Sequence, residues 1–152
     1  SNQESKSTDE AIDVRYKTHS PCTFSISLPS NFKMLTMYDD ASPDFCDYIV
    51  STEDGFEVIE LHSLLNSRFD FIAIEKLYED AQLNSELEIS YKTQKDNWFV
   101  ISGTNKKNGN IVYWKRVSGE NFISDLHIEY PNNHKAEIEP YIGTISNSFT
   151  SD

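Results

Sequence analysis

The chain has 152 residues, of which 38% are hydrophobic and 25% charged, and these proportions exclude collagen-like, low-complexity and fully disordered proteins. Its 13 Lys and Arg residues against 25 Asp and Glu residues give a formal net charge of −12, which opposes attraction to nucleic acid and to anionic lipid. No run of consecutive apolar residues is longer than residues 98–101, far short of the roughly 18 that a membrane-spanning helix needs.

Residues 1–18 are predicted to form a flexible polar tail, followed by a single domain over residues 19–150. Ordering most of this tail would cost about 15–30 kcal/mol of backbone entropy. Burial of Ala11, Ile12 and Val14 would return at most roughly 7 kcal/mol. The opening Ser-Asn-Gln-Glu-Ser resembles the polar tether that follows the lipidated cysteine of bacterial lipoproteins. We therefore hypothesise an N-terminal lipid anchor as the only link to a membrane.

The first half of the domain is predicted to contain four β-strands. Phe24, Ile26 and Leu28 alternate with polar residues, so residues 23–28 form a strand with one buried face. Pro29 is expected to end this strand because it has no N–H to donate to a neighbour. Further strands are expected over residues 32–37, 45–51 and 56–65, the last with a bulge where its alternation changes phase.

A helix is predicted next, because the apolar spacing changes from two residues to that of one helical face. The residues that share this face lie between residues 67 and 84, with Ser67 or Asp70 as the N-cap: Phe71, Ile74, Leu77, Tyr78 and Ala81. Four more strands follow over residues 86–92, 98–102, 111–117 and 122–130. The Asn108-Gly109 pair supplies the positive φ that the turn between the middle two strands requires.

A C-terminal helix is predicted over residues 138–149, with Pro140 in its first turn. Residues 98–101 and 111–114 are apolar on both faces, and a strand needs two apolar faces only when both are covered. Most connections have hairpin length, which favours antiparallel pairing. We therefore expect an α+β fold, a mainly antiparallel sheet with helices on both faces in an α-β-α sandwich.

Two cysteines, Cys22 and Cys46, have a spacing that matches no zinc or redox motif. A disulfide between them would close a loop of about 25 residues and contribute roughly 3.5 kcal/mol, but only in an oxidising compartment. The alternative is a pair of buried free thiols, and the spacing leaves both open. A metal site that combines these cysteines with His19 and His62 is chemically less simple than thiol pairing.

The sequence contains no recognised catalytic motif. Phosphate loops, dinucleotide-binding glycines, His-Glu-x-x-His and Gly-x-Ser-x-Gly are all missing, and the four histidines are dispersed. The acidic residues Asp39, Asp40, Asp44 and Asp47 lack the spacing of a calcium loop, which indicates a solvated acidic segment. No pair of acids is singled out for proton transfer. We therefore expect no catalytic residue, metal or cofactor, and the chain is predicted not to be an enzyme.

The basic residues are concentrated in residues 92–116, which carry six bases and one acid, a net charge of +5. Aromatic residues lie among these bases, and such a patch can bind an acidic peptide, a polysaccharide or another subunit. The candidate binding surface consists of Trp98, Lys106, Lys107, Tyr113, Trp114, Lys115 and Arg116. The alternative is that both tryptophans belong to the core and the lysines merely solubilise a hairpin.

Four short stretches and the order of the elements resemble the PsbP-like superfamily, which includes the photosystem extrinsic protein and the eukaryotic Ran-binding Mog protein. The stretches are residues 23–32 (Thr-Phe-Ser-Ile-Ser-Leu-Pro-Ser-Asn-Phe), 98–103 (Trp-Phe-Val-Ile-Ser-Gly), 128–131 (Ile-Glu-Tyr-Pro) and 145–149 (Ile-Ser-Asn-Ser-Phe). The start of the first stretch, the Tyr-Pro pair and the Ser-Phe ending look like those of uncharacterised bacterial extracytoplasmic members of this superfamily. The resemblance implies an α-β-α sandwich that binds or assists, with no catalytic residue to carry over.

These observations together predict a non-catalytic binding or accessory module that contacts another protein, in the periplasm or at the cell surface. The alternative is a small-ligand-binding protein with a pocket between the sheet and a helix, and an unrecognised enzyme ranks third. A carrier should show a closed apolar pocket of at least roughly 300 Å³. A binding module should instead show a contiguous exposed aromatic patch without a deep cavity.

Overall fold

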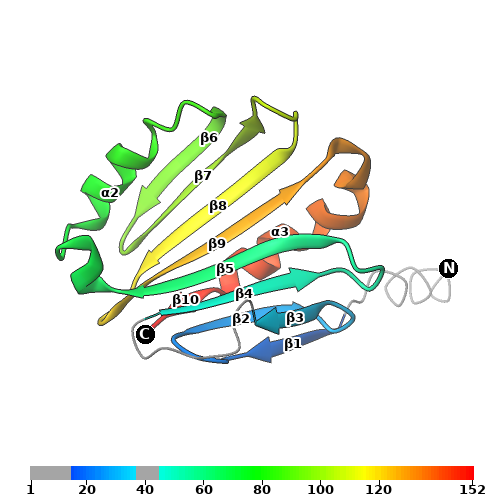
Figure 1. Ribbon diagram of the computed structural model, residues 1–152, viewed down its shortest axis with the longest axis horizontal. Helices are drawn as coiled ribbons and strands as arrows, with labels where there is room; N and C mark the ends of the chain where they lie inside the picture. Colours follow the sequence, from blue (N-terminus) through cyan, green and yellow to red (C-terminus); the bar gives the residue numbers. More distant parts are fainter. Residues whose placement is uncertain (1–14, 37–44) are drawn as a thin grey trace, which may run out of the picture.

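The computed structural model describes residues 15–36 and 45–152, and Figure 1 shows how their elements are arranged. Strands make up most of these residues, with two α-helices and two short 3-10 helices between them. In chain order the elements are β1 (Tyr16–His19), β2 (Phe24–Pro29), β3 (Lys33–Thr36), β4 (Phe45–Ser51), β5 (Glu57–Leu65), a 3-10 helix (Asn66–Phe69), α2 (Ile74–Ala81), β6 (Leu87–Lys95), β7 (Trp98–Asn105), β8 (Ile111–Ser118), β9 (Phe122–Tyr130), a second 3-10 helix (Asn132–His134), α3 (Lys135–Ser148) and β10 (Thr150–Ser151).

The strands form two antiparallel sheets. The larger sheet has seven strands in the order β3-β4-β5-β9-β8-β7-β6, and the smaller has three in the order β1-β2-β10. Hairpins connect β6 to β7, β7 to β8 and β8 to β9, and every pairing between described strands is antiparallel. The pairing of β4 with β5 skips Val58, which is the predicted irregularity. The predicted α+β class with mainly antiparallel sheets is confirmed.

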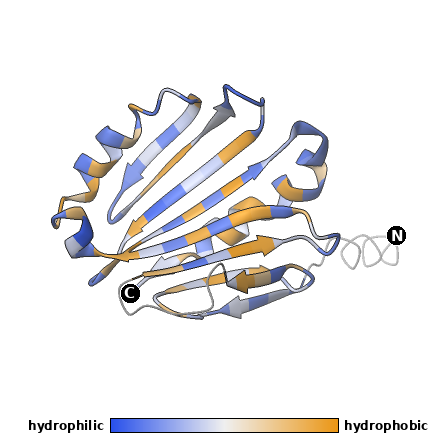
Figure 2. Ribbon diagram, in the orientation of Figure 1, coloured by the Kyte–Doolittle hydropathy of each residue, from blue (hydrophilic) through white to orange (hydrophobic). Residues whose placement is uncertain are grey.

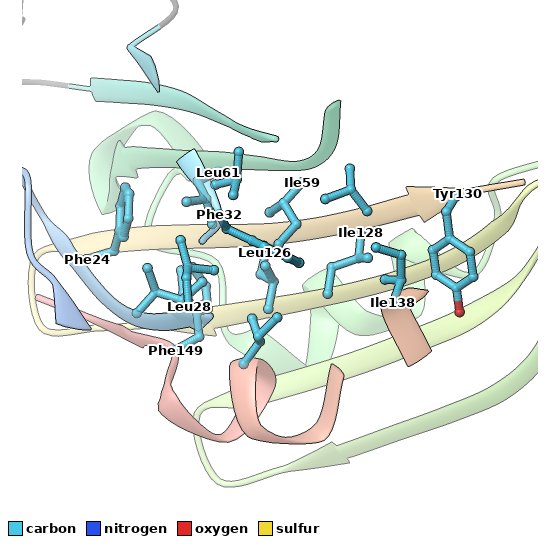
Figure 3. Packing of buried hydrophobic residues seen from close by; sticks show 14 of the residues in the cluster. Phe24, Leu28, Phe32, Ile59, Leu61, Leu126, Ile128, Tyr130, Ile138 and Phe149 are labelled. Atoms are coloured by element: carbon cyan, nitrogen blue, oxygen red, sulfur yellow. The ribbon is translucent and has the colours of Figure 1, made fainter. Parts of the chain in front are cut away.

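The larger hydrophobic cluster joins α3 to β2, β5 and β9. Figure 3 shows Ile138 of α3 close to Ile128 and Tyr130 of β9. Phe24 and Leu28 of β2 close the cluster from the smaller sheet, and all five side chains are almost completely buried. Full burial of one such side chain stabilises the fold by about 1.5–3 kcal/mol, so this cluster holds the two sheets together.

A second cluster joins α2 to β6, β7 and β8. Ile74 and Leu77 of α2 pack in it with Phe99 and Ile101 of β7. Neighbouring residues of one strand contribute to different clusters, since Ile111 and Tyr113 pack with the α3 cluster whereas Val112 and Trp114 pack with the α2 cluster. Hydropathy changes from residue to residue along many of these strands in Figure 2.

A chain of hydroxyl groups crosses between the sheets. Thr23 Oγ1 lies 2.6 Å from Ser63 Oγ of β5, which lies 2.9 Å from Ser124 Oγ of β9. Ser124 Oγ in turn lies 2.7 Å from Ser151 Oγ of β10. Ser63 and Ser124 are completely buried, and each hydroxyl can donate one bond and accept others. The chain therefore satisfies these groups while it ties β10 to the larger sheet.

Cys22 and Cys46 are joined by a disulfide, with 6.7 Å between their Cα atoms. Cys46 lies in β4, whereas Cys22 precedes β2 rather than lying in a strand. The bond attaches the start of the smaller sheet to the larger one. Neither cysteine is a free thiol, so neither is available as a metal ligand.

The predicted helix over residues 67–84 is wrong in its first half. A 3-10 helix ends at Phe69, and the next two residues, Asp70 and Phe71, have positive φ angles of 54° and 56°. This left-handed pair interrupts the helical path, so α2 begins only at Ile74 with Ala73 as an N-cap that makes no side-chain bond. Phe71, predicted to be buried on the helix face, is therefore 76% exposed.

Both ends of the domain also differ from the prediction. β1 begins at Tyr16, so residues 16–18 pair with β2 instead of belonging to a flexible tail, while residues 1–14 lie outside the described residues. α3 begins at Lys135, which places Pro140 beyond the first turn. Pro140 has no N–H, so it cannot donate the usual helical hydrogen bond to the Ala136 carbonyl. Ala136 is exposed, and water can donate to this carbonyl instead.

Candidate functional site

The structure divides the predicted binding surface between two faces and a hairpin tip. Trp98 and Tyr113 pack in the cluster that contains α3, and Lys115 bonds to Ser146 of that helix, so we call their face of the strands the α3 side. Trp114 packs in the cluster that contains α2, and Arg116 lies against its ring, so we call their face the α2 side. Lys106 and Lys107 lie at the β7–β8 turn. The predicted surface is therefore not one patch, because neighbouring residues in a strand point to opposite faces.

On the α3 side, the polar groups attach the helix to the sheet. Lys115 is only 7% exposed, its Nζ donates to the Ser146 carbonyl oxygen at 2.6 Å, and it lies 5.1 Å from the centre of the Trp98 ring. Tyr113 Oη lies 2.7 Å from Ser146 Oγ. Burial lowers the pKa of Lys115 and raises that of Tyr113. These side chains serve packing rather than an exposed interface.

On the α2 side, the Asp125 carboxylate accepts three hydrogen bonds. Arg116 donates from Nε to Oδ1 at 2.6 Å and from Nη2 to Oδ2 at 3.0 Å, and Trp114 donates its indole N–H to Oδ1 at 3.0 Å. The Arg116 guanidinium also lies 5.0 Å from the Phe69 ring centre and 5.2 Å from that of Trp114. This bidentate, stacked arrangement fixes Arg116 in place.

The sequence reasoning missed a row of alternating charge that crosses four strands. Strand register places Asp47 of β4 beside His62 of β5, His62 beside Asp125 of β9, and Asp125 beside Arg116 of β8. His62 Nδ1 lies 2.6 Å from Asp47 Oδ1, and its Nε2 lies 3.5 Å from Glu60 Oε2. Cross-strand neighbours share one face of a sheet, so all of these groups lie on the α2 side.

A second row of charged groups lies two residues further along the strands, on the same face. Glu60 of β5 faces His127 of β9, and His127 Nε2 lies 3.1 Å from Glu129 Oε1. Glu129 also accepts from Asn110 Nδ2 at 3.1 Å and from Asn105 Nδ2 at 3.4 Å. Burial favours the neutral form of Glu129, but the bonds from His127 and Asn110 outweigh it and lower the pKa of this carboxyl.

Two hollows adjoin on this face, and His127 and Glu129 line both of them. The larger has a volume of 480 Å³ over the start of β5 and the end of β9. The smaller, of 160 Å³, reaches the connection between α2 and β6. We call the pair the His127 groove, and it is lined by Ile49, Phe56, Glu57, Val58, Ile59, Glu60, Asn84, Glu86, Leu87, Asn105, Asn110, Val112, Trp114, His127, Glu129 and Pro131.

Among residues 15–36 and 45–152, no three His, Cys, Asp or Glu side chains are grouped so that they could hold a metal ion. Asp47 of the predicted acidic segment is bonded to His62, and Asp39, Asp40 and Asp44 lie outside the described residues. No helix in the described part of the chain has the length and apolar character required to cross a membrane.

The signal for the groove is present in the sequence as alternating histidines and acids: residues 60, 127 and 129 line the groove, and residues 62 and 125 lie beside them in the same strands. Alternation alone shows only that these residues share a face of their own strand. Which strand lies beside which, and in what register, decides that the two sets meet, and neither can be derived from the spacing.

No family model and no curated protein matches the chain. One solved structure that it resembles is the solution structure of cyanobacterial PsbP (CyanoP) from Synechocystis sp. PCC 6803. The TM-score is 0.51 at 8% identity, over 91% of this chain and 92% of that chain. Another is the crystal structure of LpqN, involved in cell envelope biogenesis of Mycobacterium tuberculosis, with a TM-score of 0.44 at 13% identity over 95% of each chain. The likeness to cyanobacterial PsbP confirms the PsbP-like fold that the sequence resemblance implied.

Proposed function

We propose that this chain is a non-catalytic binding or accessory module that acts outside the cytoplasm, in the periplasm or at the cell surface. The Cys22–Cys46 disulfide supports the compartment, because such bonds persist in oxidising environments and are rare in the cytosol. Thiol trapping tests it. Protein precipitated with acid from its native cells should react with a maleimide only after reduction, whereas reaction without reduction would contradict the proposed compartment.

The His127 groove is the observation that carries the binding role. It combines a hollow of 480 Å³, which lies in the usual size range of ligand sites, with an adjoining smaller hollow. The charged groups that line it are held by hydrogen bonds, as between His127 and Glu129, and the row that contains His62 and Asp47 lies beside it on the same face. Such a surface is already ordered before a partner arrives, which lowers the entropic cost of association.

Site-specific crosslinking tests the binding surface. A photoreactive amino acid replaces Glu57, which lines the groove, and in a matched variant it replaces Glu88, an exposed residue of β6 that alternates with the buried side of that strand. We expect a discrete protein adduct in native cells from position 57 and none from position 88. Equal adducts from both positions, or adducts from position 88 alone, would remove the groove as the binding surface.

A small-ligand carrier is the second candidate, and the 480 Å³ hollow favours it. A hollow of 360 Å³ also lies between the sheet and a helix, where the pocket was expected, and residues of β6, β7, β8, β9 and α3 line it. Native mass spectrometry of protein purified from its own cells would reveal a bound small molecule as a fixed mass increment. A bare polypeptide mass, together with a crosslinked protein at position 57, would favour the protein-binding role.

We also propose that α2 and α3 cover opposite faces of the larger sheet in an α-β-α arrangement. Supporting this, Ile101 packs in the cluster of Leu77 from α2, while Leu126 packs in that of Ile145 from α3. In NMR spectra, we expect NOEs between methyl groups of the same cluster and none between methyl groups of different clusters.

The hypothesised lipid anchor concerns the N-terminal segment alone. We expect labelled palmitate to be incorporated into the protein in its native cells. A protein that carries no label would contradict the proposed lipid anchor.

A further inference from the structure

If the His127 groove is the binding surface proposed above, its lining defines the chemistry of the partner. We propose that the groove binds an extended basic peptide segment in which lysine or arginine side chains alternate with apolar ones. This partner follows from the shape of the groove, its apolar floor and its charge.

The shape favours a chain over a compact ligand. The two hollows share His127 and Glu129, and together they reach from Phe56, just before β5, to Asn84 beyond α2. A single amine or guanidinium group would fill only part of one hollow. An extended segment presents successive side chains in opposite directions, so alternate residues can enter the groove while the others face away.

The floor offers apolar contacts in both hollows. Ile49 and Phe56 line the larger hollow, and Val112 and Trp114 line the smaller. Trp114 already donates its indole N–H to Asp125, and Arg116 lies 5.2 Å from its ring centre, so the part of the ring that lines the smaller hollow remains for a ligand. The hydrocarbon stems of lysine and arginine pack on such surfaces while their charged ends reach polar groups at the rim.

Carboxylates stand at each end of this floor. Glu57 and Glu60 line the larger hollow, Glu86 lines the smaller, and Glu129 lines both. The donors that lower the pKa of Glu129 keep it ionised at neutral pH. Acidic groups spaced along an apolar floor match a segment in which basic and apolar residues alternate.

The basic groups nearest the groove are already matched by carboxylates. Lys107 Nζ lies 2.7 Å from Glu86 Oε1, Arg116 is bonded to Asp125, and His127 contacts Glu129. The groove still carries four carboxylates, those of Glu57, Glu60, Glu86 and Glu129, against His127 and the adjoining Lys107, so its net charge is negative. The formal charge of −12 on the whole chain adds a long-range attraction for a basic partner.

Fluorescence anisotropy with synthetic peptides tests the proposal. The probe is a labelled peptide of about ten residues in which lysine alternates with valine, and its counterpart carries glutamate in place of lysine. We expect only the lysine peptide to bind, with an affinity that falls as salt is raised from low to physiological ionic strength. Glu57→Gln and Glu129→Gln should each weaken binding about two- to fivefold, the range for partly exposed charge pairs. Glu88→Gln, which removes the same charge from the other face of β6, should leave the affinity unchanged.

Three results would overturn the proposal: equal binding of the glutamate peptide, no loss in either groove variant, or an equal loss in Glu88→Gln. The last would show attraction to net charge alone. Unfolding midpoints confirm that all variants are folded. A protein adduct at position 57 without selectivity for the lysine peptide would leave the groove as the binding surface and reject only the basic partner. Selective peptide binding that neither Glu57→Gln nor Glu129→Gln changes would instead reject the groove.

Discussion

His62 has a carboxylate beside each ring nitrogen, Asp47 at Nδ1 and Glu60 at Nε2. A neutral imidazole has one N–H, so only the protonated ring can donate to both. Burial acts to lower the pKa of His62, but the hydrogen bond to Asp47, the charge of Asp47 and the contact with Glu60 together raise it above 6.5. Protonation of the ring therefore strengthens the link between β4 and β5.

This arrangement predicts a pH-dependent contribution to stability. The folded state holds the proton more tightly than the unfolded state, so the contribution is fully present below the ordinary pKa of 6.5 and is lost as pH rises through the raised, folded-state pKa. Urea unfolding of the wild-type protein and of His62→Gln at several pH values should show that the substitution costs more at acidic pH than at alkaline pH. A His62 pKa below 6.5 in an NMR titration would contradict the account.

Lys115 predicts a different response, because burial disfavours its charge and no carboxylate within the described residues is bonded to it. Lys115→Met keeps the apolar stem beside Trp98 and removes the buried charge. The Ser146 carbonyl that Lys115 contacts also accepts from the Phe149 N–H, so it keeps a partner. We expect the free energy of unfolding to stay within about 1 kcal/mol of wild type or to rise. A loss above about 3 kcal/mol in urea unfolding would show that the lysine is essential to the core.

At the scale of elements, the left-handed turn before α2 predicts an unusual ranking of substitutions. Phe71 has a φ of 56°, a conformation that costs free energy in a residue other than glycine. Its side chain is mostly exposed, so burial offsets little of that free energy. Phe71→Gly should leave stability unchanged or raise it by up to about 1 kcal/mol, because glycine adopts this φ without strain. Phe71→Val should lower it, since a branched side chain is disfavoured there. Thermal unfolding that ranks valine above glycine would contradict the turn geometry.

The elements predicted correctly from the sequence have a clear period of two. β2 and β9 alternate over five and seven residues, so burial of one face determines their identity, whereas β6 alternates only as far as Ile89, because its pairing with β7 skips Ser90 and leaves Tyr91 56% exposed. β1 and β10 are too short to show a period, and pairing with β2 defines them instead. The helix prediction failed at Asp70 and Phe71, because helical spacing cannot report a left-handed backbone.

The candidate site was less predictable than the fold. A sequence segment identifies which residues are basic or aromatic, and this led to a surface that included Lys115 and Arg116. In β8 these neighbours point to opposite faces, and each is held by a partner on another element, Ser146 of α3 and Asp125 of β9 respectively. Contacts of this kind follow from strand order and register, which act over the whole sheet.

At the scale of the whole molecule, the Cys22–Cys46 bond should contribute to global stability. It closes a loop with a sequence separation of 24 residues, and in the chain-entropy model such a bond contributes roughly 3.5 kcal/mol. Replacing both cysteines with alanine should lower the free energy of unfolding by about this amount, and a reductant should lower that of wild type similarly. An unchanged unfolding midpoint in the reduced protein would show that the hydrophobic clusters alone join the sheets.

The claim that the His127 groove is the binding surface is tested most directly by an NMR titration with the lysine–valine peptide. We predict that amide shift changes concentrate at Asn110, His127 and Glu129, with Glu57 and Trp114 at the two ends of the affected surface. Amides of the opposite face of β6, such as that of Glu88, should remain unchanged. Shift changes centred on that opposite face, or spread evenly over the acidic residues of the chain, would contradict the account.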